Sequence, residues 1–119
     1  MNKATFDKLK DFRRTLHQYP ELSGEEKETA SRVLEFFKEI LADQVLENLG
    51  GNGLAFVFEG KEKGPTTLYR CELDGLPIRE DNNIKYKSTI PGKAHLCGHD
   101  GHMAIIAGLG LYLKENRPK

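Results

Sequence analysis

The chain has 119 residues, of which 38% are hydrophobic and 30% are charged, and its 18 basic residues balance its 18 acidic ones. A net charge of zero provides no long-range field that would attract nucleic acid or an anionic membrane. No apolar run approaches the roughly 20 residues of a membrane-spanning helix, and the N-terminal segment lacks the apolar core of a secretion signal. We therefore expect a cytoplasmic chain, long enough for one domain, with neither nucleic-acid nor membrane partners.

Two amphipathic helices are expected in the first part of the chain. Apolar residues recur every three or four positions, which predicts a helix over 3–18: Phe6, Leu9, Phe12 and Leu16. Pro20 should end this helix. Ser23 and Glu26 form a capping-box pattern that predicts the start of a second helix, ending near Asp43. Its expected buried stripe consists of Ala30, Val33, Leu34, Phe37, Ile40 and Leu41.

The pattern after the second helix is typical of strands. A short strand is predicted over 45–49, followed by a glycine-rich turn over 50–53 and a second strand over 54–58. A charged connection leads to a third predicted strand over 66–73. We expect the strands over 54–58 and 66–73 to form a hairpin or to lie next to each other in a sheet.

The rest of the chain is predicted to form a long loop followed by a helix. Residues 74–101 carry several prolines and glycines, and loops of this length are commonly functional. The last helix, predicted over 102–114, is apolar nearly all round and should be covered on more than one side. Two helices, then strands, then a buried helix indicate an α/β fold with layered sheet and helices.

The segment His95-Leu-Cys97-Gly-His99-Asp100-Gly-His102 contains three of the four histidines and one of the two cysteines. In an extended segment His95, Cys97 and His99 project to one side, and thiolate and imidazole are ligands that zinc and similar ions prefer. Asp100 suits either a helix cap or an acceptor that orients a neighbouring imidazole. Spacing alone leaves open that these are ordinary loop histidines beside a buried thiol.

A second group of polar residues lies where the third predicted strand meets the long loop. Glu72 and Asp74 share one face of that strand, and α/β sheets place active sites at the carboxyl ends of strands. Position alone is equally consistent with Asp74 starting a turn before Gly75.

Three motifs together resemble the amidohydrolase branch of the zinc-type carboxypeptidase/aminoacylase family. Residues 14–22 (RTLHQYPEL) resemble its R-x-x-H-x-x-P-E-L segment. Residues 72–80 (ELDGLPIRE) resemble its A-D-x-D-A-L-P-I strand end, and 91–102 (PGKAHLCGHDGH) its H-A-C-G-H-D-x-H loop. The motifs occur in the family's order, and the match covers nearly the whole chain. The branch includes hippurate hydrolases, deacylases of N-acyl amino acids and hydrolases of auxin conjugates.

The resemblance implies an α/β/α zinc-peptidase-like catalytic domain with two divalent ions per site: zinc, manganese, nickel or cobalt. It implies that Cys97 and His99 are metal ligands and that Asp74 is the acidic residue supporting the site. His95 and His102 have no ligand role in the motif and would shape the loop or orient ligands. The implied reaction is hydrolysis of the amide bond of an N-acyl amino acid or small peptide, by a metal-activated water and a glutamate that shuttles the proton.

The sequence departs from the family pattern in two ways. Glu72 replaces the usual first aspartate, and the family's remaining ligands, catalytic glutamate and lid or dimerisation domain have no counterpart in these residues. We therefore expect residues 1–119 to form an incomplete catalytic domain, inactive alone, from an enzyme that can form homodimers. The alternatives are a non-catalytic metal-binding or interaction module, and a hydrolase that uses Cys97 as nucleophile.

Overall fold

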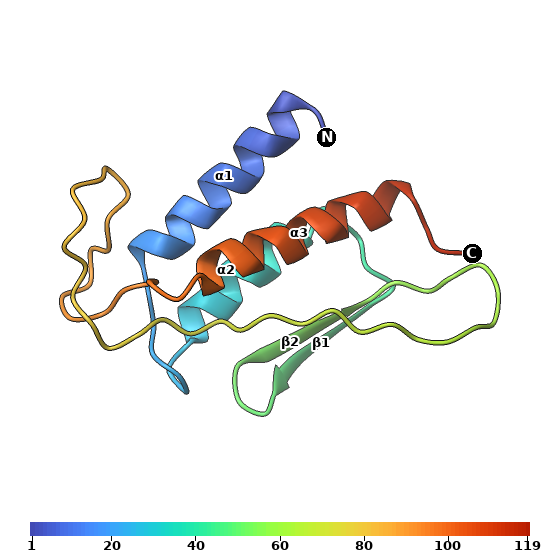
Figure 1. Cartoon of the computed structure of the whole chain (residues 1–119). Coiled ribbons are helices and arrows are strands. Elements are labelled where there is room, and N and C mark those ends of the chain that lie inside the picture. Colours follow the sequence, from blue (N-terminus) through green and yellow to red (C-terminus); the bar gives the residue numbers. More distant parts are fainter.

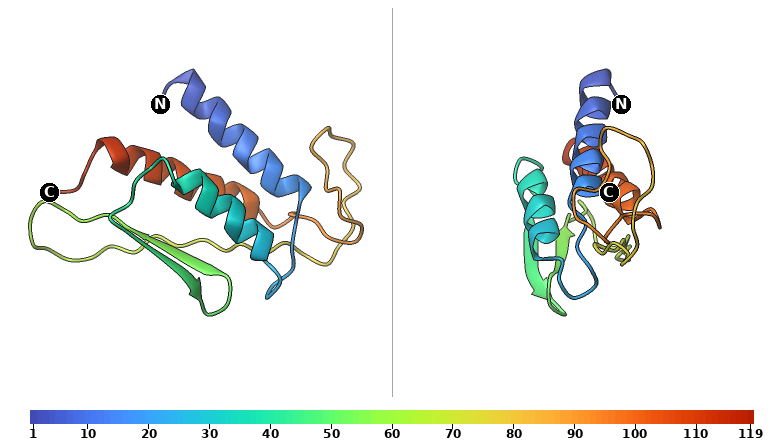
Figure 2. Two further views of the ribbon diagram at one scale, coloured as in Figure 1. Left: turned by 180° about the vertical axis from the view of Figure 1, so that it is seen from behind. Right: turned by 90° about the vertical axis from the view of Figure 1, so that its left-hand side faces the viewer.

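The computed structural model describes all of residues 1–119 and has three helices and one two-stranded sheet. In chain order these are α1 (Lys3–Gln18), α2 (Lys27–Phe37), β1 (Gln44–Leu49), β2 (Gly53–Val57) and α3 (His99–Glu115). Helices α1 and α3 pack against each other, α2 contacts both, and β2 packs on α2 (Figures 1 and 2). This order and layering confirm the predicted α/β class. None of the helices combines the length and the apolar character needed to cross a bilayer.

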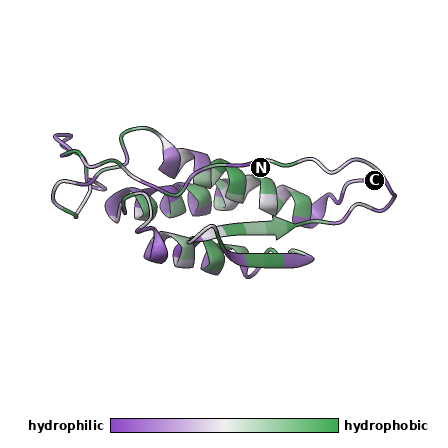
Figure 3. Cartoon of the chain, turned by 90° about the horizontal axis from the view of Figure 1, so that it is seen from below, coloured by the Kyte–Doolittle hydropathy of each residue, from purple (hydrophilic) through white to green (hydrophobic).

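An apolar core joins the three helices, and apolar side chains of the hairpin pack against it. It consists of Leu9, Leu16, Val33, Phe37, Ile40, Met103 and Ala107. Gly110 allows α3 to approach α2 closely, because a Cβ atom at this position would lie 2.7 Å from the Phe37 ring. The same ring stacks on Phe56 of β2, with 3.8 Å between ring centroids. Phe37 therefore joins the helical layer to the hairpin, and apolar residues gather along both elements (Figure 3).

Strands β1 and β2 form an antiparallel hairpin that closely matches the strands predicted over 45–49 and 54–58. Val45 pairs with Phe56, and the register shifts between Leu46 and Leu49. The shift coincides with a left-handed backbone at Asn48, where φ is 57°. The predicted glycine-rich turn is confirmed, since it connects the two strands.

Helix α2 begins three residues later than the capping-box pattern predicts, and Ser23 does not cap it. The N-cap residue is Glu26, whose side chain makes no capping hydrogen bond. Instead, the carboxylate of Glu21 accepts hydrogen bonds from the Thr29 backbone N–H at 2.5 Å and from the Thr29 hydroxyl at 2.6 Å. The cap prediction was wrong because a carboxylate from the preceding loop reaches the free N–H groups first.

The end of α2 also differs from the prediction. The helix stops at Phe37, and Leu41 adopts a left-handed backbone with φ of 60°. This turn leaves Ile40 fully buried but exposes 69% of Leu41, which was predicted to lie in the buried stripe. Helical periodicity extended beyond the last helical residue therefore misplaces Leu41.

Residues 66–73 do not form the predicted third strand, and they do not pair with β2. The segment runs extended beneath α3 (Figure 1). Only two isolated bridges follow it, between Gly75 and Leu22 and between Leu76 and Ala94. Strand-forming residues favour an extended backbone, but a strand also requires a neighbour that pairs with it.

Helix α3 begins at His99, three residues before its predicted start. Gly98, with φ of 102°, turns the chain into the helix, and its carbonyl accepts the first helical hydrogen bond from the His102 N–H. The helix buries one face, while Ile105 on another face is 69% exposed. The expectation of burial on more than one side is therefore not met within these residues.

Candidate metal centre

Three side chains converge where the extended segment 66–73 meets the first turn of α3. They are Glu72, Asp74 and His99, and each offers one ligand atom, all within 4.8 Å of one another. His99 reaches them because it is the first residue of α3, so the helix start turns its ring toward the extended segment. The carboxylates of Glu72 and Asp74 face the same ring because they stand two positions apart on an extended chain.

The hydrogen bonds of His99 determine which ring nitrogen can bind a metal. Its Nδ1 lies 2.8 Å from the Asp74 carbonyl oxygen and 3.1 Å from the Asp74 carboxylate. A carbonyl oxygen can only accept, so Nδ1 carries the hydrogen and donates it to Asp74. In the neutral ring, Nε2 then has a free lone pair, which is the arrangement that metal-binding histidines use.

The free nitrogen faces a carboxylate, and this pair fits a divalent cation. His99 Nε2 lies 3.1 Å from Glu72 Oε2. A lone pair and a carboxylate repel each other unless a proton or a cation lies between them. Two ligand atoms that each lie about 2.1 Å from one ion are separated from each other by a distance close to these 3.1 Å. The donor set therefore suits a divalent ion that accepts nitrogen and oxygen ligands.

Cys97 lies apart from this group. Its side chain is exposed and its thiol is free, and the set of converging donor atoms does not include it. His95 is also outside the set, so the alternation of His95, Cys97 and His99 does not by itself bring their donors together. The reason is that His99 already belongs to the helix, whereas the alternation argument requires an extended segment.

His95 is buried without a hydrogen-bond partner. It is 3% exposed, and neither Nδ1 nor Nε2 contacts a donor or acceptor. Burial lowers the pKa of His95 from its ordinary value, because a charged imidazolium would lose its hydration. The ring is therefore neutral.

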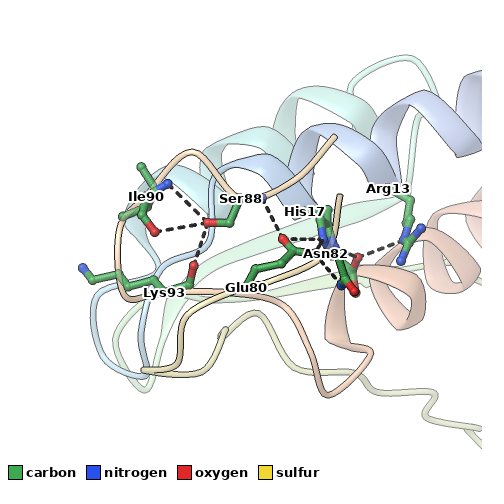
Figure 4. Close-up of polar contacts among 8 residues, drawn as sticks. Arg13, His17, Glu80, Asn82, Ser88, Ile90 and Lys93 are labelled. Atoms are coloured by element: carbon green, nitrogen blue, oxygen red, sulfur yellow. Dashed lines mark hydrogen bonds and ion pairs between the residues drawn. The ribbon is translucent and has the colours of Figure 1, made fainter. Parts of the chain in front are cut away.

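A second histidine cluster lies inside the protein, behind the first turn of α3 (Figure 4). His17 of α1 has both ring nitrogens on carboxylates: Nδ1 lies 2.8 Å from Asp100, and Nε2 lies 2.9 Å from Glu80. Arg13, one turn earlier on α1, also contacts Asp100, with 2.8 Å between Nε and Oδ2. The side chains of His17, Glu80 and Asp100 are at most 4% exposed.

Glu80 is the most strongly perturbed carboxyl group of this cluster. Burial alone would raise its pKa, but hydrogen bonds from Asn82, the Ser88 N–H and His17 outweigh burial and lower the pKa to about 2. Glu80 is therefore ionised at neutral pH, and it fixes the loop that contains Asn82 and Ser88 to α1.

Sequence reasoning did not find this cluster. Of the two roles considered for Asp100, the structure shows the second: it orients an imidazole, that of His17, and the N-cap position belongs to Gly98. His17 pairs with residues 63 and 83 positions away, so no local pattern contains them. The available signal was a histidine directly after Leu16 on the buried face of an amphipathic helix.

Comparisons with known proteins show which family the chain resembles. The model of peptidase family M20/M25/M40 matches residues 68–119. An N-acetyldiaminopimelate deacetylase of Lactobacillus helveticus is 40% identical over 119 residues, which cover 97% of this chain and 31% of that protein. An N-acetylcysteine deacetylase of Bacillus subtilis is 34% identical, with 98% of this chain and 30% of that protein covered.

A solved structure agrees with the sequence relatives. The YXEP protein of Bacillus subtilis, described as a dinuclear metal binding peptidase of the M20 family, superimposes with a TM-score of 0.92 at 35% identity. The superposition covers 98% of this chain and 33% of that one. The chain thus spans about a third of the length of the relatives and the structure that it matches.

The fold matches about a third of a dinuclear metal binding peptidase, and Glu72, Asp74 and His99 form a carboxylate–imidazole group on it. The resemblance that its motifs indicate is confirmed: the chain belongs to the peptidase M20 family, in its amidohydrolase branch.

Proposed function

We propose that this chain supplies one side of the dinuclear metal centre of an amidohydrolase that cleaves N-acyl amino acids. The observation that carries the proposal is the convergence of Glu72, Asp74 and His99. The exposed thiol of Cys97 lies two residues before His99. Relatives named as deacetylases of N-acetyl amino acids support the substrate class. Zinc, manganese, nickel and cobalt all suit a site with sulfur, nitrogen and oxygen donors.

In this proposal Cys97 and His99 are the metal ligands, and Asp74 supports them. Asp74 holds the hydrogen on Nδ1 of His99 and thereby directs Nε2 toward the ion. Glu72 presents a carboxylate beside Nε2 and adds negative charge that favours a cation. A bound divalent ion would polarise an amide carbonyl and lower the pKa of a water molecule. A zinc site normally has three or four protein ligands, so we expect no turnover by residues 1–119 alone.

Both thiols of the chain are free in the structure. A thiolate ligand must stay reduced, so we also propose that the protein works in the cytoplasm, where disulfides are rare. Its proposed partners are the N-acyl amino acid or peptide substrate and, through the remainder of the enzyme, a second subunit.

Titration of the chain with zinc, monitored by calorimetry, tests the assignment of Cys97 and His99 as ligands. We expect the zinc affinity to fall at least about tenfold in Cys97→Ala and in His99→Ala, because each removes a direct ligand. Cys71→Ala is the matched control, since it removes the other, half-buried thiol and should leave the affinity unchanged. Stoichiometric zinc bound by Cys97→Ala at the original affinity would overturn the assignment of Cys97.

The proposed hydrolysis is tested by an activity assay on the native protein purified from its cells. Release of free amine from N-acetyl amino acids should stop when a chelator removes the metal and should return when zinc or manganese is restored. Hydrolysis that resists the chelator but is lost in Cys97→Ala would instead support the thiol as nucleophile.

A further inference from the structure

The first turn of α3 is fixed to α1 by a buried ion pair directly beside the proposed ligand. Asp100 follows His99 in sequence, is 1% exposed, accepts a hydrogen bond from His17 and forms an ion pair with Arg13. Neighbouring residues of a helix point about 100° apart. Asp100 therefore faces α1 while His99 faces Glu72 and Asp74, so holding Asp100 also fixes the direction of His99.

The other side of His17 holds the loop that follows Asp74. Its Nε2 contacts Glu80, whose carboxylate also accepts hydrogen bonds from Asn82 and Ser88. The same loop is paired at its base, where the Leu76 N–H donates to the Ala94 carbonyl at 2.8 Å. His17 is thus a single side chain that joins the helix carrying His99 to the loop that continues from Asp74.

A His17 ring with a hydrogen on each nitrogen satisfies both of its buried contacts. Each ring nitrogen lies within 3.0 Å of a buried carboxylate, and a neutral imidazole can donate from only one nitrogen. The imidazolium donates from both, and together with Arg13 it balances the two negative charges of Glu80 and Asp100. A buried group of charges persists when it is paired and hydrogen-bonded in this way.

We propose that His17 is a positioning residue for the metal centre: its imidazolium bridges Asp100 and Glu80 and so holds His99 against Glu72 and Asp74. His17 does not touch the proposed ligands and acts only through Asp100 and the loop. The proposal rests on the proposed function, since it assigns to His17 the orientation of that same site.

The test is the zinc affinity of His17→Gln, which is uncharged and can satisfy only one of the two carboxylates. We expect its affinity for zinc to fall by about 10- to 100-fold, the loss that residues supporting a ligand usually cause. Far-UV circular dichroism should show that helix content is retained. A zinc affinity equal to that of the wild type would overturn the inference and leave the metal site itself in place. A wild-type chain that binds no zinc would overturn the metal site and the inference with it.

Ile40→Val is the matched control for lost stability. Ile40 is fully buried at the other end of the helical layer, against Gly110. Gly110 lies eleven residues after His99 on α3, or about 16 Å along the helix. A loss of packing there should lower stability without changing zinc affinity. An equal loss of affinity in Ile40→Val and His17→Gln would mean that only general stability matters, and would contradict the inference.

Two further measurements keep the inference testable if His17→Gln does not fold. In Glu80→Gln one charge is removed while the shape is kept, and we expect a smaller but measurable loss of zinc affinity. Nitrogen NMR of the wild-type chain without metal should show both ring nitrogens of His17 protonated at pH 7. A ring with one unprotonated nitrogen would contradict the proposed bridge.

Discussion

The molecule contains two histidine–carboxylate clusters built from the same chemical groups on opposite sides of the first turn of α3. In the inner cluster, His17 and both carboxylates are at most 4% exposed, and each ring nitrogen has its own carboxylate. In the outer cluster, the side chains of Glu72 and Asp74 are 46% and 28% exposed, and His99 has one nitrogen held by Asp74 and the other 3.1 Å from Glu72. Burial makes the first cluster structural, whereas exposure leaves the second available for binding.

Replacing one glutamate by alanine in each cluster should distinguish the structural cluster from the binding cluster most clearly. Glu80→Ala leaves the charge of His17 and the donors of Asn82 and Ser88 without a partner, so we expect a loss of about 3–5 kcal/mol in the free energy of unfolding. Glu72→Ala removes an exposed carboxylate and should change stability by less than about 0.5 kcal/mol. Urea denaturation of the metal-free chain measures both. Equal losses would mean that the two clusters do not differ in this way.

Acid should weaken the inner cluster over a definite range of pH. The pKa of Glu80 is lowered from 4.5 to about 2 in the folded chain, so its contribution is present above pH 4.5 and is lost as the pH falls through 2. The shift corresponds to about 3 kcal/mol in full. Other carboxyl groups also titrate there, so the measurement is the difference between wild type and Glu80→Gln in urea denaturation at pH 7 and at pH 3. A difference that does not shrink with acid would contradict the assignment.

The parts of the fold that sequence predicts well are those that depend on neighbouring residues. The apolar period of 3–18 and the glycine-rich turn at 50–53 encode α1 and the hairpin directly. The cap by Glu21 depends on a residue outside the helix, and the missing strand over 66–73 depends on a pairing partner elsewhere in the chain. Local pattern cannot supply those, because a strand needs a partner and a cap can come from outside the helix.

In the candidate site, too, some residues can be predicted from local motifs, whereas pairings between distant residues cannot. Asp74 and His99 can be selected from motifs, and the structure brings them within hydrogen-bonding distance. Glu72 differs from the family pattern in the sequence, and the structure places it opposite the free nitrogen of His99. The pairing of His17 with Glu80 could not be predicted, because nothing in the sequence indicates which buried carboxylate lies nearest in space.

His95 provides the smallest and most discriminating comparison, because it is a buried histidine with neither nitrogen paired. Replacing an unsatisfied polar group with an apolar one of similar size removes a desolvation cost. We therefore expect His95→Leu to leave the free energy of unfolding unchanged or to raise it by up to about 1 kcal/mol. The same change at His17 removes the partner of two buried carboxylates and should cost about 3–5 kcal/mol. Urea denaturation of the two leucine variants gives the contrast directly. A loss at His95 as large as that at His17 would show that the His95 ring nitrogens have partners in solution, and the distinction between a paired and an unpaired buried histidine would then no longer hold.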